Sequence, residues 1–159
     1  MSINYRAIGI IHTPFTTKEG MPIQPLGAAG IKGTVVLKKK YSEGLKDLDG
    51  FSHIILIYHL HKSKGYNLQV VPFLDSESHG VFATRAPRRP NSIGISVVKL
   101  ASISENVLEI ENVDIIDGTP LLDIKPYTAQ FDHFPTEKNG WLDKASGRVT
   151  KAKSDARFK

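Results

Sequence analysis

The chain of 159 residues has the length of a single domain, and its 40% hydrophobic and 23% charged residues are ordinary for a soluble globular protein. It has no cysteine, which excludes disulfides and cysteine-ligated zinc or iron–sulfur centres. The formal net charge of +5 is concentrated near the C-terminus, because residues 1–132 hold 14 basic and 13 acidic groups whereas the last 27 residues hold 7 and 3.

Strand signals dominate the chain. Segments rich in β-branched and aromatic residues, bounded by glycine, proline and polar residues, predict strands. In chain order they are Ile8–Ile11, Gly33–Leu37, Phe51–His61, Leu68–Leu74 and Ile93–Ile103. A hairpin is predicted between Ser96–Ser104 and Val107–Ile116, through Glu105 and Asn106.

Helix signals are few. The best is Ser42–Leu48, with Ser42 as a possible N-cap and Gly44 limiting the helix to two turns at most. Short strands without an alternating strand–helix rhythm predict a mainly β fold, a compact antiparallel or mixed β-barrel with one or two short helices.

The apolar pattern fades after Asp132. We therefore predict a barrel domain over 1–132 and a basic C-terminal extension over 133–159, which packs through Phe134 and Trp141-Leu142 and then frays. The basic tail suits a polyanionic partner such as nucleic acid, although a solvated lysine-rich terminus has the same composition. No signal peptide or membrane span is visible, so we expect a cytoplasmic protein.

Residues 80–94 form the first candidate binding segment. They hold Arg85, Arg88 and Arg89, and the neighbouring Pro87 and Pro90 stiffen the loop. Arginine forks suit carboxylates and phosphates, and a loop that is already ordered lowers the entropy cost of binding. A binding loop is favoured over a surface loop whose arginines pair with nearby carboxylates.

Residues 114–127 form the second candidate segment. Asp117-Gly118 is a turn signal, and its backbone groups could read an adenine edge or hold a ribose. Asp114, Asp117 and Asp123 supply carboxylates for a cationic ligand or for acid–base chemistry. Taken by themselves, these residues favour a turn whose aspartate caps its own backbone.

The third segment is the strand predicted over 51–61. A period of two puts His53, His59 and His61 on one face with Ile55 and Ile57. A His-x-His pair can contribute to a metal site, but no acidic residue stands at a supporting spacing, so no metal is expected. Dinucleotide-binding, phosphate-loop and nucleophile-elbow motifs are also absent.

These segments carry a family resemblance. Residues 80–94, through Gly80–Arg85, Arg89–Asn91 and Ile93-Gly94, are similar to the signature of the TrmO/TsaA-like family. Residues 117–127, from Asp117-Gly118-Thr119-Pro120 to Pro126-Tyr127, are similar to its second signature. Ile8–Phe15, Gln24-Pro25 and Phe51–His53 also resemble the family, in the same order, so the match covers about residues 5–132. Ala86 and Ser92 depart from the usual serine and proline.

The resemblance implies a β-barrel methyltransferase that works as a homodimer, binds S-adenosylmethionine near the subunit interface, and methylates N6 of threonylcarbamoyladenosine at position 37 of a tRNA. It implies a cofactor site built by Gln24, Pro25, Leu26, His61, Lys62, Arg85, Ile95, Ile116, Asp117, Gly118 and Thr119. We expect the tRNA to meet Arg88, Arg89, Asn91, Lys125 and Tyr127. The resemblance identifies no catalytic side chain.

Three alternatives remain open at this stage. The first is a small barrel that binds RNA or a nucleotide without catalysis. The second is a metal-dependent enzyme that uses His59 and His61. The third is a methyltransferase with a different acceptor.

Overall fold

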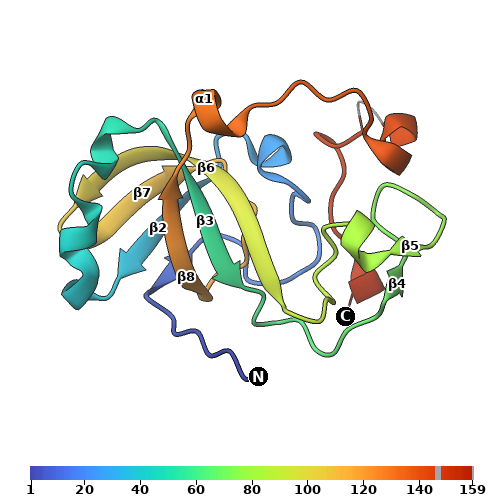
Figure 1. The fold of residues 1–159 in the computed structure, drawn as a ribbon, viewed down its shortest axis with the longest axis horizontal. Coiled ribbons are helices and arrows are strands. Elements are labelled where there is room, and N and C mark those ends of the chain that lie inside the picture. Colours follow the sequence, from blue (N-terminus) through green and yellow to red (C-terminus); the bar gives the residue numbers. More distant parts are fainter. Residues whose placement is uncertain (146–147, 159) are drawn as a thin grey trace.

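Six strands close into a barrel in which every neighbouring pair is antiparallel, in the order β1-β2-β7-β6-β3-β8 (Figure 1). The computed structural model describes residues 1–145 and 148–158. The barrel strands are β1 (Gly9–His12), β2 (Lys32–Leu37), β3 (His53–His59), β6 (Ile93–Ser104), β7 (Val107–Glu111) and β8 (Thr119–Pro126). The predicted mainly β barrel is confirmed.

The predicted hairpin is confirmed at its turn. Ser104 pairs with Val107 across Glu105 and Asn106, and Glu105 takes a positive φ of 52°. The second strand, however, ends at Glu111 rather than at Ile116. The cause is Asn112, whose left-handed backbone (φ 64°) leaves the ladder.

The strand predicted over Leu68–Leu74 is reduced to a two-residue strand. β4 (Gln69–Val70) pairs with β5 (His79–Gly80) in a small sheet beside the barrel. Pro72 and the turn around Asp75 interrupt the ladder after Val70, because proline has no N–H to donate.

The helix predicted over Ser42–Leu48 is wrong in type and in its N-cap. The segment forms two 3-10 helices, η2 (Lys39–Leu45) and η3 (Leu48–Gly50). Ser42 lies inside η2 and its hydroxyl donates back to the Lys39 carbonyl, which competes with α-helix hydrogen bonding. Short 3-10 helices also include η1 (Pro25–Ala28) and η4 (Val81–Ala83), and the one α-helix among the described residues is α1 (Ala129–Asp132).

The barrel core is filled by side chains that alternate along the strands. In β3, Ile54, Leu56 and Tyr58 are buried while the residues between them are half-buried or exposed. Buried side chains from all six strands continue this cluster, and they include Ile11, Val35, Val98, Leu108, Ile110 and Leu121. The alternation predicted for β3 is therefore confirmed over His53–His59, whereas His61 lies past the strand end.

The C-terminal segment packs beside the barrel instead of fraying. Phe158, in η6 (Ala156–Phe158), is 7% exposed and joins a second apolar cluster with Val70 and Val81. Phe134 is 73% exposed, so the expectation that it anchors the segment is wrong. Figure 1 shows the segment, in red, crossing to the same side of the molecule as β4 and β5. No helix in residues 1–145 or 148–158 is long and apolar enough to span a membrane.

Candidate functional site

A cavity of about 310 Å³ opens at the end of the barrel where β3 finishes and where β6 and β8 begin. We call it the inner cavity. Its walls come from the β1–β2 connection, the strand ends, the arginine loop 84–89, residues 114–116 and the C-terminal segment. Its volume lies at the lower end of the range of small-molecule sites, about 300–1,000 Å³.

A line of three hydrogen-bonded polar side chains lies at the inner cavity, with Tyr58 and Asp114 in the cavity wall and the buried Ser96 between them. Ser96 Oγ donates to Asp114 Oδ1 at 2.6 Å, and Tyr58 Oη lies 2.9 Å from the same Ser96 oxygen. Because the serine has a single hydroxyl proton, Tyr58 donates to Ser96 and Ser96 donates to Asp114. The line therefore ends on a carboxylate that faces the cavity.

Burial controls the protonation of this line. Burial raises the pKa of Asp114 to about 6, while its bond to Ser96 and the positive charge of Arg85 act in the opposite direction. Burial and the negative charge of Asp114 also raise the pKa of Tyr58, which therefore stays a neutral donor. Above pH 6 the cavity thus holds a partly desolvated negative charge, which favours a cationic ligand.

Gly94 allows the tyrosine to reach this position. A Cβ on Gly94 would lie 2.6 Å from Cζ of Tyr58, the residue opposite it in the β3–β6 ladder. The absence of a side chain at Gly94 therefore leaves room for the tyrosine ring to cross β6 and bond to Ser96.

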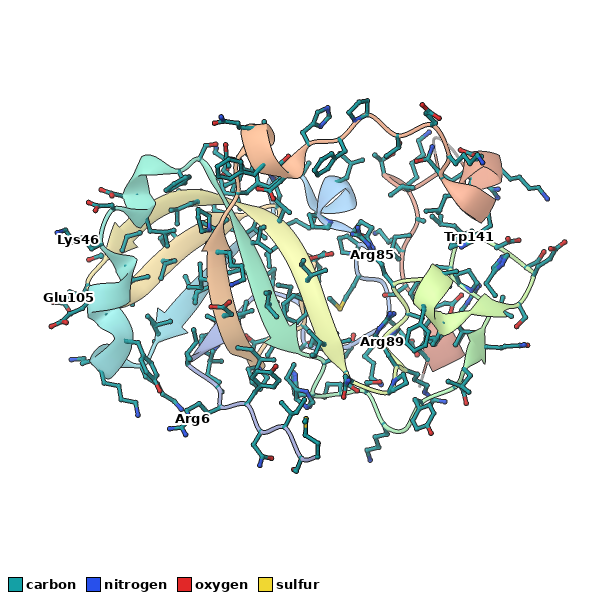
Figure 2. The ribbon with its side chains drawn as sticks, in the orientation of Figure 1. Arg6, Lys46, Arg85, Arg89, Glu105 and Trp141 are labelled. Carbon is teal, nitrogen blue, oxygen red and sulfur yellow. The ribbon has the colours of Figure 1, made fainter. Side chains whose placement is uncertain are left out.

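The arginine loop presents its three arginines in different ways. Arg85 is exposed, and its Nη1 donates to Gln24 Oε1 at 2.9 Å across the cavity mouth. Arg89 is half-buried, and its Nη1 donates to the carbonyls of Thr84 at 2.9 Å and Ala86 at 3.1 Å. Arg88 has a buried Nε that bonds to no described residue. Figure 2 shows Arg85 and Arg89 between the barrel and Trp141.

The turn over 116–119 is tied to the end of β1. Asp117 Oδ1 accepts from the Thr13 amide at 3.1 Å and lies 3.2 Å from His12 Nδ1, and the Gly118 amide donates to the Ile11 carbonyl. The Thr13 amide is the main reason that the pKa of Asp117 is lowered. Gly118 has φ 75°, which favours glycine in this turn. The turn thereby sets Ile116 and Thr119 in the cavity wall.

The structure brings together only some of the residues predicted for the cofactor. Those in the inner cavity wall are Gln24, Lys62, Arg85, Ile95, Ile116 and Thr119. Outside the wall are Pro25, Leu26, which is 68% exposed, and Asp117 and Gly118, which hold the turn. His61 also lies outside, with its Nδ1 3.4 Å from Thr119 Oγ1, and its pKa is lowered by burial and by Lys62.

The residues predicted for the tRNA are more scattered. Arg89 lines the inner cavity, and Asn91 is exposed at the end of the same loop. Lys125 and Tyr127 lie at the opposite end of the barrel, where Lys125 pairs with Ile55 in the ladder and the Tyr127 amide donates to the His53 carbonyl. Thr119 and Lys125 are six residue steps apart along the extended strand, a distance of about 20 Å.

Four positive charges gather at the cavity, and the sequence analysis named Lys62 and Arg88 but missed Lys18 and Lys64. Lys18 lines the cavity, and its pKa is lowered by burial and then by the charges of Arg88, Lys64 and Lys62. These four cations come from three loops that are distant in sequence, so nothing in the sequence indicated that they would lie together. Like charges gathered in this way suit phosphate groups.

The C-terminal segment also contributes wall residues that the sequence did not indicate. Ser154, Asp155 and Phe158 line the inner cavity. Ser154 is held by its hydroxyl, which donates to the Lys18 carbonyl and accepts from the Met21 amide. The only available signal was the aromatic Phe158 in a polar segment.

The histidine strand shows no sign of a metal centre. His59 is exposed at the end of β3, and His61 faces Thr119. Within 1–145 and 148–158, no three histidine, aspartate or glutamate side chains gather in a group able to hold a metal ion. The inner cavity instead suits a small organic ligand with positive charge, and it lies next to a basic surface.

Comparisons with known proteins identify the family of this chain. Residues 10–133 match the model of the tRNA-methyltransferase O N-terminal domain. A Pyrococcus abyssi protein named as a probable S-adenosyl-L-methionine-binding protein is 54% identical over 158 residues, 99% of this chain and 86% of the relative. A mouse tRNA (adenine(37)-N6)-methyltransferase is 36% identical over 79% of this chain, which spans 31% of that enzyme.

A solved structure extends the likeness to the fold. The crystal structure of TrmO from Pseudomonas aeruginosa superposes with a TM-score of 0.75 at 36% identity, covering 89% of this chain. The chain spans 63% of the length of that structure. Because the family model matches most of its residues, this chain belongs to the tRNA-methyltransferase O family and carries that family's N-terminal domain.

Proposed function

We propose that the protein is an S-adenosylmethionine-dependent methyltransferase that acts on N6 of threonylcarbamoyladenosine at position 37 of tRNA. The observation that carries the proposal is the inner cavity. It combines the half-buried Asp114 carboxylate with an apolar wall, and Arg85 lies at its mouth. The names of the mouse enzyme and of the archaeal relative support the reaction and the cofactor.

The residues of the inner cavity fit this cofactor. The Asp114 carboxylate suits a ligand with positive charge, and Ile95, Ile116 and Phe73 supply an apolar surface that excludes water. Gln24 and Arg85 would hold polar groups at the mouth. When bound, the cofactor supplies an electrophilic methyl group on a sulfonium. The chain's task is then to position the acceptor nitrogen in a dry site.

The basic side chains support tRNA as the partner. Lys18, Lys62, Lys64 and Arg88 gather next to the cavity, and the C-terminal segment adds Lys151 and Lys153. Phosphate contacts by such side chains release counterions, so we expect tRNA binding to weaken steeply as the salt concentration rises. These features suit an enzyme of the cytoplasm, where tRNA is modified.

A homodimer is part of the proposal. Ile93 and Ile95 line the inner cavity but are 42% and 51% exposed, and Leu26 nearby is 68% exposed. Exposed apolar side chains at a binding site are typical of a surface that another subunit covers. A partner subunit in this position would close the cofactor site.

Calorimetric titration with S-adenosylmethionine tests the proposal. We expect saturable binding, weakened about tenfold or more in Arg85→Ala, since about 1.4 kcal/mol corresponds to a factor of ten. Lys99→Ala is the matched control, because Lys99 forms only a surface ion pair with Glu111 and should leave binding unchanged.

Methylation of tRNA with and without threonylcarbamoyladenosine then identifies the acceptor. Transfer only to the modified tRNA agrees with the proposal, and transfer only to another RNA changes the acceptor. Absence of cofactor binding both with and without tRNA would leave a non-catalytic RNA-binding barrel and would refute the methyltransferase.

A further inference from the structure

A second cavity of about 490 Å³ lies beside the inner cavity, and we call it the outer cavity. The two cavities share six wall residues: Ile23, Gln24, Phe73, Thr84, Arg85 and Phe158. The two cavities are therefore adjacent along this shared wall, in which Arg85 is hydrogen-bonded to Gln24. A ligand in the outer cavity would lie directly against the site proposed for the cofactor.

Aromatic and aliphatic side chains line the outer cavity. Phe82 is 76% exposed, and Leu142 and Trp141 come from the C-terminal segment. Flat apolar surfaces of this kind stack on nucleobases, at about 1–3 kcal/mol per base. Arg85 is the charged residue in this wall, and a guanidinium also stacks on bases or binds anionic groups.

The tryptophan is fixed before any ligand arrives. Trp141 Nε1 donates to the Ala83 carbonyl at 2.8 Å, and its ring stacks on His79 with 5.0 Å between centroids and 16° between planes. His79 is held in turn by Asp75, 2.8 Å from its Nε2. A wall ordered in this way loses little entropy when a base binds.

We propose that the outer cavity is the pocket for the acceptor nucleobase, a purine turned out of the RNA and held between Phe82 and the Trp141 wall. The inference rests on the proposed function, because the shared wall matters only if the inner cavity holds the methyl donor. Methyl transfer needs donor and acceptor to be in contact, and the shared wall is where two ligands in these cavities would meet. The C-terminal segment then has a direct role in binding RNA.

Binding of a free nucleoside to the full-length protein tests the pocket without any catalysis. The probe is N6-threonylcarbamoyladenosine, titrated in the presence of saturating S-adenosylmethionine. Trp141 is the single tryptophan of the chain, so its fluorescence reports on the outer cavity. We expect the modified nucleoside to quench the Trp141 fluorescence saturably, and we expect guanosine and uridine to quench it only weakly.

Phe82→Ala is the decisive variant, because an exposed side chain can be removed without loss of folding. We expect the dissociation constant of the nucleoside to rise about 5- to 150-fold, the equivalent of 1–3 kcal/mol of stacking. Phe134→Ala is the matched control: Phe134 is 73% exposed and belongs to neither cavity wall, so it should change nothing.

Three results would overturn the inference. The first is a failed binding test, either an unchanged nucleoside affinity in Phe82→Ala or no nucleoside binding to the wild type up to its solubility limit. The second is displacement of S-adenosylmethionine by the nucleoside, which would place the base in the inner cavity. The third is dissociation of a dimer by Phe82→Ala with nucleoside binding intact, which would make the outer cavity a subunit contact. Failure of cofactor binding in the wild type is a separate result, and it counts against the proposed function instead.

Discussion

Replacement of Arg89 by alanine should lower the free energy of unfolding by about 2–4 kcal/mol and abolish ligand binding in both cavities. The Arg89 guanidinium donates to the Thr84 and Ala86 carbonyls, with the Val81 carbonyl at 3.4 Å. These carbonyls belong to a loop whose Thr84 side chain is itself 8% exposed. Alanine would leave them without their charged donor, and the loop that carries Arg85 would lose its conformation.

Equilibrium unfolding followed by tryptophan fluorescence measures this effect, because Trp141 is hydrogen-bonded to Ala83, the residue just before this loop. Arg6→Ala is the control, since Arg6 is exposed near the N-terminus and lies on the far side of the barrel from Arg89 (Figure 2). If Arg89→Ala unfolds like the wild type but fails to bind tRNA, Arg89 contacts the RNA, as its place in the sequence predicts, and does not hold the loop.

The class of fold was readable from the sequence because it depends on local patterns. The alternation of buried Ile54, Leu56 and Tyr58 with outward residues is a property of any half-buried strand. The Glu105-Asn106 turn likewise needs only its own residues and their neighbours. Closure of the barrel was not readable in this way, since it requires β1 to pair with β8, more than 100 residues away.

The candidate site was readable only where its residues are adjacent in the chain. The arginine loop was found because its three arginines fall within five residues. The line of Tyr58, Ser96 and Asp114 was not found, because it joins three segments that only the folded barrel brings together. The same holds for Phe158, which reaches the cavity from the last residues of the chain.

Adjacency in the chain also misleads. Asp117 to Tyr127 read as one signature, so Lys125 and Tyr127 were expected at the same site as Thr119. The segment is an extended strand, however, and carries Lys125 to the other end of the barrel, where it pairs with Asp123 at 2.8 Å. A contact of Lys125 and Tyr127 with tRNA stays a prediction. It requires the tRNA to reach a part of the protein surface that is distant from both cavities.

Asp114→Asn should stabilise the folded protein at pH 8 by about 3 kcal/mol, at about 1.4 kcal/mol for each pKa unit. Burial raises the pKa of Asp114 from 3.8 to about 6, so ionisation of this carboxyl costs free energy in the folded state. An asparagine has nearly the same shape and can still accept the hydrogen bond from Ser96 through its oxygen. Removal of the charge therefore relieves a cost and keeps the contact.

The pH dependence follows from the sign of the shift. Well below pH 3.8 Asp114 is protonated in both the folded and the unfolded state, so the wild type and Asp114→Asn should be equally stable there. Between pH 4 and 6 the unfolded state loses its proton first, and the wild type loses stability relative to the variant. Above pH 6 the difference stays constant. Asp123→Asn is the control, because Asp123 is in an exposed ion pair and should change stability by less than about 1 kcal/mol.

The same substitution should weaken the binding of S-adenosylmethionine, and the two effects together separate a functional carboxylate from a structural one. A carboxylate kept only for the fold would be one whose removal destabilises the protein. A carboxylate that destabilises the free protein and strengthens its affinity for a cationic ligand is instead retained for binding. We expect the wild type to gain more thermal stability from saturating cofactor than Asp114→Asn does, by an amount that grows as the pH rises from 5 to 8. An Asp114→Asn variant that is less stable at pH 8 and binds the cofactor as tightly as the wild type would refute both the position of the buried charge and its role.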